Sequence, residues 1–279
     1  MVDTNRGNRL SGGKGSPPSD TISTGPARCP RASGETLAGS EMPLVRCEES
    51  VVPYGIDWKT KNLRASASGV RPDDVRSRGL EADMIGHVVG ADEVPSVVDT
   101  LAEAFATDPV WSWAIPQETR RRAVFSRLWR VFVESAAEDD WVWSTSGCEA
   151  VAVWNPPGCA DLSQAASERL DAIIESLGTA AGRIRSVLDA FSDHRPPAPD
   201  HFYLNMVGVK GRSRGSGLGM RLVSENLDAV DRLGAPTYLE SSNPDNVDRY
   251  ERVGFEVLAT FTMPGGGPRV TTMWREPSG

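Results

Sequence analysis

The chain contains 279 residues, 39% of them hydrophobic and 24% charged, and its formal net charge is −8 at pH 7. This length suits one domain with a tail or two small domains, and the acidic balance argues against a nucleic-acid partner bound by a bulk positive field. The four cysteines form no Cys-x-x-Cys pair and have no histidine at ligand spacing, which argues against a zinc site and a disulfide scaffold.

Nothing in the sequence favours membrane insertion or secretion. No stretch approaches the ~20 consecutive apolar residues of a membrane span. Gly, Ser and Pro follow Arg6 and Arg9, where a secretory signal would carry an apolar run. We therefore expect a cytoplasmic protein without a bound metal ion, which acts on neither a nucleic acid nor a membrane. Its oligomeric state, monomer or homodimer, is left open.

The composition changes near residue 84. Residues 1–83 contain 32 Gly, Pro, Ser and Thr residues and carry a net charge of +1, whereas residues 84–279 carry a net charge of −9. A segment of the first kind, without a sustained hydrophobic period, buries too little apolar surface to offset its conformational entropy. We expect a disordered extension over 1–83 and one folded domain over 84–279, with Met84 as a candidate for the true start.

The hydrophobic pattern from Met84 onward predicts a mixed α/β domain around one sheet. Alternation of Ile85, His87 and Val89 predicts a first strand, and Asp92 is placed to cap the helix that follows. The remaining elements are expected in this order: a helix around 125–136, strands at 140–146 and 149–155, helices over 161–191 with a break at 178–182, a strand at 201–209, a helix at 217–233, a strand at 237–240, a short helix at 244–252, and a hairpin of 255–263 with 269–274.

A glycine-rich segment separates the strand at 201–209 from the helix at 217–233. From 210 to 219 it reads Lys-Gly-Arg-Ser-Arg-Gly-Ser-Gly-Leu-Gly. Glycines let backbone amides approach an anion, and a helix N-terminus adds partial positive charge. A Walker A loop is excluded because no lysine follows Gly219, and the Gly-x-Gly-x-x-Gly fingerprint is excluded because the spacing from Gly215 differs. Arg214–Gly219 satisfies Arg/Gln-x-x-Gly-x-Gly; the alternative is a helix start without a ligand.

A second motif follows about 24 residues later. Asn243 begins an Asn-Pro turn, Tyr250 stands seven residues on, and Gly254-Phe255 enters the next strand. Together the two segments resemble the pyrophosphate loop and the Asn…Tyr-x-x-x-Gly-Phe region of the GNAT superfamily of N-acetyltransferases, a likeness that spans about 84–279. Four more segments are similar to puromycin N-acetyltransferase and its bacterial relatives: Ala104–Pro109, Ala150–Trp154, His194–Pro196 and Leu239–Ser241.

The resemblance implies a GNAT-like α/β fold with a mixed, largely antiparallel sheet, flanked by helices, in which a central parallel strand pair splays apart. Acetyl-CoA would lie in that gap as co-substrate. The backbone of Met206, Val207 and Val209 would pair with its pantetheine arm. Asn243 would contact the cofactor, or would serve only as a turn residue. The pyrophosphate would be held by the amides of Arg214, Gly215, Ser216, Gly217, Leu218 and Gly219.

Acyl transfer to an amine needs a neutral acceptor, a donor to the oxyanion and a proton for the leaving thiolate. Glu240, at the mouth end of the second splayed strand, is the candidate base, directly or through water; the alternative is a solvated or ion-paired carboxylate. The resemblance makes Tyr250 the proton donor to the thiolate, the alternative being a packing role. The Val207 amide could donate to the oxyanion.

Three aromatic side chains are candidates for the acceptor site. Tyr203, at the start of the first splayed strand, either lines the pocket or packs in the core. Trp111 and Trp113, expected in a loop after Asp108-Pro109, could form an exposed wall.

The sequence therefore predicts an enzyme that moves the acetyl group of acetyl-CoA to a primary amine of a small molecule, with an aminonucleoside-type antibiotic as one candidate acceptor. Two alternatives remain open: a protein or peptide N-acetyltransferase, and a CoA-binding sensor without turnover. The presence of both Glu240 and Tyr250 argues against the sensor.

Overall fold

The computed structural model describes residues 84–278. The extension expected over 1–83 lies outside the described residues. The elements run in the order β1 (Gly86–Val88), α2 (Val94–Phe105), α3 (Pro109–Ala114), α4 (Glu118–Glu138), β2 (Val142–Thr145), β3 (Ala150–Asn155), α5 (Gln164–Glu175), α6 (Ala181–His194), β4 (Phe202–Val209), α7 (Leu218–Arg232), β5 (Thr237–Ser241), α8 (Val247–Glu251), β6 (Glu256–Thr262) and β7 (Arg269–Arg275).

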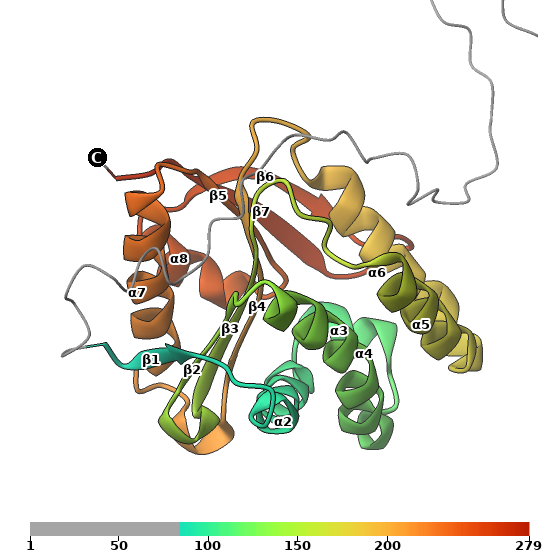
Figure 1. Cartoon of the computed structure of the whole chain (residues 1–279). Helices are drawn as coiled ribbons and strands as arrows, with labels where there is room; N and C mark the ends of the chain where they lie inside the picture. The colour runs from blue at the N-terminus through green and yellow to red at the C-terminus, as the bar shows by residue number, and fades with distance from the viewer. Residues whose placement is uncertain (1–83, 279) are drawn as a thin grey trace, which may run out of the picture. The chain divides into compact units, whose positions relative to one another are not determined.

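Seven strands form one sheet in the order β1-β2-β3-β4-β5-β7-β6 (Figure 1). Every neighbouring pair is antiparallel except β4 and β5, which run parallel. The predicted mixed, largely antiparallel sheet with one central parallel pair is confirmed. The hairpin of β6 and β7 is confirmed as well, and its second strand lies beside β5.

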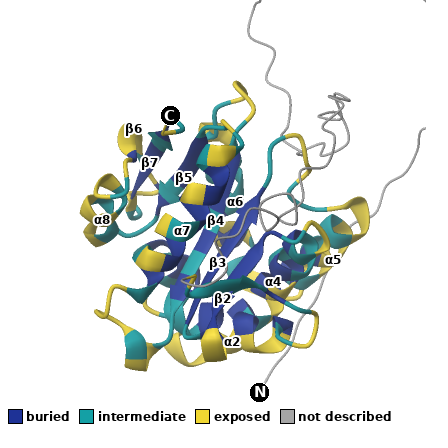
Figure 2. Cartoon of the chain, turned by 60° about the vertical axis from the view of Figure 1, so that its left-hand side comes forward, coloured by how far each residue is buried: buried dark blue, intermediate teal, exposed yellow. Residues whose placement is uncertain are grey.

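Helices cover both faces of the sheet. Apolar residues of α2, α3, α4, α5 and α6 share one buried cluster with Val151, Val153 and Met206 of the sheet. The opposite face carries α7, whose apolar stripe packs on Phe202 and Leu204, with part of α8 beside it. Figure 2 shows the buried positions concentrated in the central strands between these layers.

Two local expectations were wrong. Asp92 does not cap α2: the N-cap is Glu93, whose carboxylate instead lies 2.9 Å from the His87 ring nitrogen Nε2 and accepts from the Gly90 amide. The segment after Asp108 is the helix α3 and not a loop, because Asp108 caps it with its side chain and proline is tolerated in the first turn.

None of the helices within residues 84–278 is both long and apolar enough to cross a membrane.

Candidate active site

The parallel strands β4 and β5 separate soon after they meet. Their pairing consists of Phe202 with Thr237 and Tyr203 with Tyr238, although β5 continues to Ser241 along β7. On the other side of β4, Trp154 lies opposite Leu204 while Val153 lies opposite Met206, so Asn205 is an extra residue in the strand. Such a bulge bends a strand and increases its twist. Within the described residues, the β5 side of β4 is therefore unpaired beyond Tyr203.

Two backbone amides of β4 face this gap. The Lys210 amide donates to the Glu149 carbonyl of the β3 side at 2.9 Å, and N–H directions alternate along an antiparallel strand. The amides of Val209 and Val207 consequently point toward β5, as expected for residues that pair with a ligand in the gap. The sequence analysis also included Met206 in this set, but the Met206 amide points to β3 by the same alternation.

The glycine-rich loop brings the N-terminus of α7 to the gap. Gly215 and Gly217 have φ of 80° and 78°, a left-handed conformation that side chains other than glycine rarely adopt. Gly219 lies in the first turn of α7, where an added Cβ would come within 2.7 Å of the Val209 side chain. The glycines thus allow the first turn of α7 to pack directly on β4. The amides of that turn and their partial positive charge lie beside the gap.

Two glutamates that the sequence analysis missed anchor this loop. The Glu103 carboxylate accepts from the Gly211 amide at 2.7 Å, and its carbonyl accepts from the Arg214 guanidinium. Glu149 binds the side chains of Arg212 and Ser213. The Arg212 guanidinium lowers the pKa of Glu149 to about 2, so this anchor is ionised at any working pH. The Arg212 side chain is therefore engaged with Glu149.

The segment after β5 is tied to the start of α3. The Ser242 hydroxyl donates to Asp108 Oδ2 at 2.6 Å, while Asp108 Oδ1 accepts from the amides of Val110 and Trp111. Burial raises the pKa of Asp108, against the lowering effect of the Ser242 hydroxyl and the two amides. Asn243 Oδ1 accepts from the Asp245 amide, which is the turn role weighed for it from the sequence.

Tyr250 lies on α8 at the same end of the sheet, with its ring 5.9 Å from that of Phe255. Burial raises the pKa of the Tyr250 phenol to about 12, and the negative charge of Asp108 contributes to the rise. The phenol therefore keeps its proton at neutral pH. A role as proton donor requires that property, and a packing role would not exclude it.

Glu240 extends from β5 with one oxygen, Oε1, buried and without a hydrogen-bond partner among the described residues. Burial raises the pKa of Glu240 to about 7, and the opposing effects of the Arg195 charge and the Tyr203 and Tyr238 hydroxyls do not offset it. Tyr238 donates its own hydroxyl hydrogen bond to the His194 carbonyl at 3.2 Å. A carboxylate of this kind exchanges its proton near neutral pH, as a general base must.

A polar network around Tyr203 was not predicted. The Arg195 guanidinium pairs with Asp161 at 2.7 Å and lies 3.7 Å from the centre of the Tyr203 ring. Beside it, Asn205 donates to Asn155 at 3.0 Å. The one signal in the sequence was the likeness at His194–Pro196, which includes Arg195 but does not reveal its partner 34 residues earlier.

The two candidate tryptophans do not form an exposed wall. Trp111 is 4% exposed and packs among aromatic rings, with its centroid 4.5 Å from that of Trp129 and 6.1 Å from that of Phe125. Trp113 is half-buried, with the Arg183 guanidinium 5.3 Å from its ring and Gly267 packed against its edge. Because α3 is a helix, its apolar side turns Trp111 into the core. Tyr203 is buried, with the Arg195 guanidinium over its ring. Its hydroxyl lowers the pKa of Glu240, so Tyr203 belongs to the polar network.

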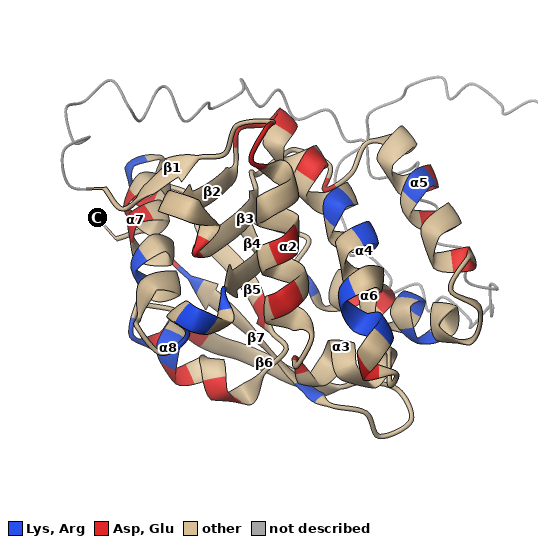
Figure 3. Ribbon diagram, turned by 90° about the horizontal axis from the view of Figure 1, so that it is seen from below, with Lys and Arg blue, Asp and Glu red and all other residues tan. Residues whose placement is uncertain are grey.

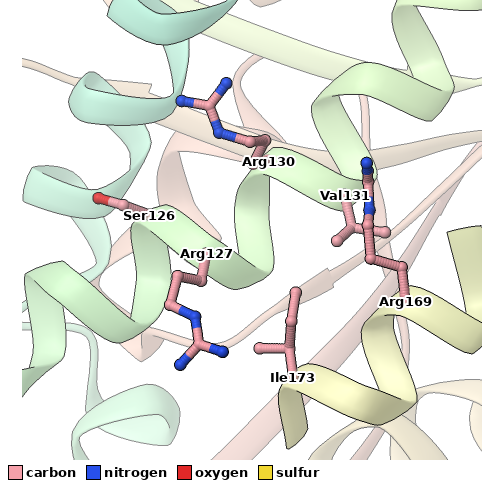
Figure 4. A pocket seen from close by; sticks show the side chains of 6 residues that line it. All are labelled: Ser126, Arg127, Arg130, Val131, Arg169 and Ile173. Atoms are coloured by element: carbon pink, nitrogen blue, oxygen red, sulfur yellow. The ribbon is translucent and has the colours of Figure 1, made fainter.

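A shallow pocket of about 350 Å³ lies apart from the gap, between α4 and α5. Arginines gather on the outer side of α4 (Figure 3), and the pocket is lined by Arg127, Arg130 and Arg169 over Val131 and Ile173. Figure 4 shows the three guanidinium groups pointing in different directions. Two of them pair with Glu134, so they do not converge on one ligand.

Residues 138–255 match the sequence model of the acetyltransferase (GNAT) family. The chain is similar to a solved structure of histone acetyltransferase HPA2 and related acetyltransferase from Corynebacterium glutamicum, with 26% identity over 70% of this chain and 96% of that one, at a TM-score of 0.49. It is similar to arylalkylamine N-acetyltransferase 2 from Aedes aegypti, with 12% identity over 69% of this chain and 98% of that one, at a TM-score of 0.49. Agmatine N-acetyltransferase shows 16% identity over 69% and 98%, at a TM-score of 0.47.

Proposed function

We propose that this chain, a GNAT-superfamily acetyltransferase by the match over residues 138–255 and by its sheet, transfers the acetyl group of acetyl-CoA to a primary amine of a small molecule. The observation that carries the proposal is the unpaired edge of β4. It has the glycine-rich loop at one end. Glu240, whose Oε1 atom is buried, and the protonated Tyr250 follow on β5 and α8.

The residues at the gap fit acetyl-CoA. Val207 and Val209 offer backbone amides to an extended arm, in the way that one strand pairs with another. The amides between Arg214 and Gly219 suit a diphosphate, because the left-handed glycines keep side chains away and the helix dipole favours anions. When bound, acetyl-CoA supplies an activated acetyl thioester.

The chain's own groups account for the protons of the reaction. An alkylammonium loses two protons on becoming an amide: one leaves before attack, and the second leaves as the N–C bond forms and the C–S bond breaks. Glu240 accepts the first and passes it to solvent, which leaves a neutral amine. Tyr250 gives a proton to the leaving thiolate and regains one from the attacking nitrogen. The Val207 amide donates to the carbonyl oxygen as that oxygen gains charge.

A small cationic amine suits the charge of the domain better than a neutral acceptor. Residues 84–279 carry a net charge of −9, and an acidic surface raises the local concentration of cations. An aminonucleoside-type antibiotic belongs to this class and is included in the test below. A protein or peptide acceptor is the second candidate.

An amine panel read by release of free CoA thiol tests the proposal. The panel contains polyamines, arylalkylamines, aminonucleosides and a set of peptides, each incubated with the full chain and acetyl-CoA. We expect thiol release that depends on one class of small amine and disappears in Glu240→Gln. Label from acetyl-CoA that enters only protein would favour the peptide reading, and tight acetyl-CoA binding without thiol release on any acceptor would favour the sensor.

A further inference from the structure

The ion pair of Arg195 and Asp161 joins two segments that flank the sheet. Arg195 follows α6 and Asp161 precedes α5, and their side chains meet at 2.7 Å. The guanidinium is mostly buried. Its central carbon lies over the Tyr203 ring, 3.7 Å from the ring centre. A cation stacked on an aromatic face and bound by a carboxylate is held in one place from two sides.

Two buried polar atoms of opposite character remain without partners beside this pair. Arg195 Nε, a donor, and Glu240 Oε1, an acceptor, form no hydrogen bond within residues 84–278. An ion pair between the two residues would satisfy both atoms. The described salt bridges include Arg195 with Asp161 and none between Arg195 and Glu240. The Arg195 charge lowers the pKa of Glu240, yet the guanidinium pairs with Asp161.

The charged and titratable groups around Glu240 are few. Arg195 and Asp161 lie on one side, and the phenols of Tyr203 and Tyr238 lie on the two strands. His201 packs its ring 5.5 Å from that of Tyr238, and burial lowers the pKa of His201, so it is neutral at pH 7. On β7 the residue opposite Glu240 is the uncharged Thr272. The Arg195 charge lowers the pKa of Glu240 and the more weakly acting Asp161 charge raises it, but burial outweighs both, so an ionised Glu240 is only partly compensated.

We infer that Asp161 is a positioning residue for Glu240: it holds the Arg195 guanidinium on the Tyr203 ring and away from the Glu240 carboxylate, so that the ammonium of the acceptor is the cation that Glu240 meets. The inference rests on the proposed role of Glu240 as base. It assigns the acceptor to cationic amines without a neighbouring carboxylate, since an acidic group beside the amine would be repelled by the ionised Glu240 carboxylate.

The first test measures the ionisation of Glu240 without any substrate. Glutamate labelled with ¹³C at the δ-carboxyl is incorporated in the full chain, and Glu240→Gln identifies the Glu240 signal. In Asp161→Asn the freed guanidinium should move the Glu240 midpoint down by about one pH unit or more. Asp171→Asn, which removes the partner of an exposed ion pair with Arg185, is the matched control and should leave the midpoint unchanged.

The second test measures catalysis with the best amine of the panel. The acidic limb of kcat/KM should shift to lower pH in Asp161→Asn, in step with the ¹³C midpoint, and should stay in place in Asp171→Asn. Tyr203→Phe, which removes a hydroxyl that favours the ionised carboxylate and keeps the ring under Arg195, should shift both in the opposite direction. If Asp161→Asn does not fold, Asp161→Ser replaces it, with the same expected shift.

The outcomes separate the inference from the proposed function. Unchanged ¹³C midpoints in folded Asp161→Asn and Tyr203→Phe would overturn the inference whatever the activity. Shifted midpoints together with full activity of Glu240→Gln would instead overturn the role of Glu240 as base. A carboxylate-bearing amine that is acetylated as fast as its decarboxylated analogue would contradict the assigned acceptor class.

Discussion

Ser242 donates a hydrogen bond of 2.6 Å to Asp108, and this contact joins the end of β5 to the cap of α3 across 134 residues of sequence. The same carboxylate holds two amides of α3 and acts on the charge state of Tyr250. The end of β5, the start of α3 and the Tyr250 phenol are therefore all influenced by one carboxylate.

Asp108→Asn should destabilise the domain by about 1–3 kcal/mol, because the amide group cannot accept both sets of hydrogen bonds as strongly as a carboxylate. It should also lower the pKa of Tyr250, since a negative charge beside the phenol is removed. Urea unfolding and ultraviolet titration of the tyrosines measure the two effects. Ser242→Ala keeps the anion and should affect stability alone; a Tyr250 titration that shifts equally in both variants would contradict the electrostatic link.

Tyr250→Phe should leave acetyl-CoA affinity and the melting temperature close to those of the unaltered chain and should lower kcat by roughly 10²–10⁴-fold, the usual contribution of a general acid. Binding is measured by calorimetry and kcat with the best amine. If kcat stays within about threefold of that of the unaltered chain, the loss is far smaller than a general acid usually contributes. Tyr250 would then be a packing residue.

The raised pKa of Glu240 predicts opposite effects of pH on activity and on stability. Activity should rise through pH 7, where the base becomes ionised. Between the ordinary value of 4.5 and about 7 the folded state binds the extra proton, so the free energy of unfolding should fall as pH rises through that window. Glu240→Gln should remove this slope and be more stable at pH 8 by about 1–3 kcal/mol. Denaturant unfolding at pH 5 and pH 8 checks the sign.

Glu149→Gln should raise the KM for acetyl-CoA several-fold with little change in kcat, because the Arg212–Ser213 segment of the loop loses its anchor. The pKa of Glu149 is about 2, so the effect should be the same from pH 6 to pH 9. Glu134→Gln, at a surface ion pair on α4, is the control. Equal KM values in the two variants would show that the anchor does not matter for cofactor binding.

Gly219→Ala should destabilise the domain by about 1–3 kcal/mol, as overpacking usually does, because the new methyl group meets Val209 at 2.7 Å. Val209→Ala should restore much of that loss when combined with it. Thermal unfolding of the two single variants and the double variant measures the coupling. Additive losses would mean that the close approach of α7 to β4 is not what glycine permits.

Patterns within one element were predictable from the sequence, and contacts between elements were not. The succession of strand, glycine-rich turn, helix and strand over residues 201–241 followed from the hydrophobic period and the turn residues. Both of these signals depend only on neighbours in the chain. Trp111 was misplaced because a six-residue helix gives too short a period to show which side is buried. The partners of Arg195, Ser242 and Gly211 lie 34 or more residues away, and nothing in a single sequence pairs them.

The extra residue at Asn205 has a mechanical consequence for the edge of β4. It shifts the alternation of side chains by one, so that Phe202 and Leu204 before it and Val207 and Val209 after it all pack beneath α7. The two residues whose amides face the gap, Val207 and Val209, are therefore among those whose side chains support the helix. A tilt of α7 would carry the glycine-rich loop and the unpaired edge of β4 together as one rigid piece, and neither could be adjusted by mutation without moving the other.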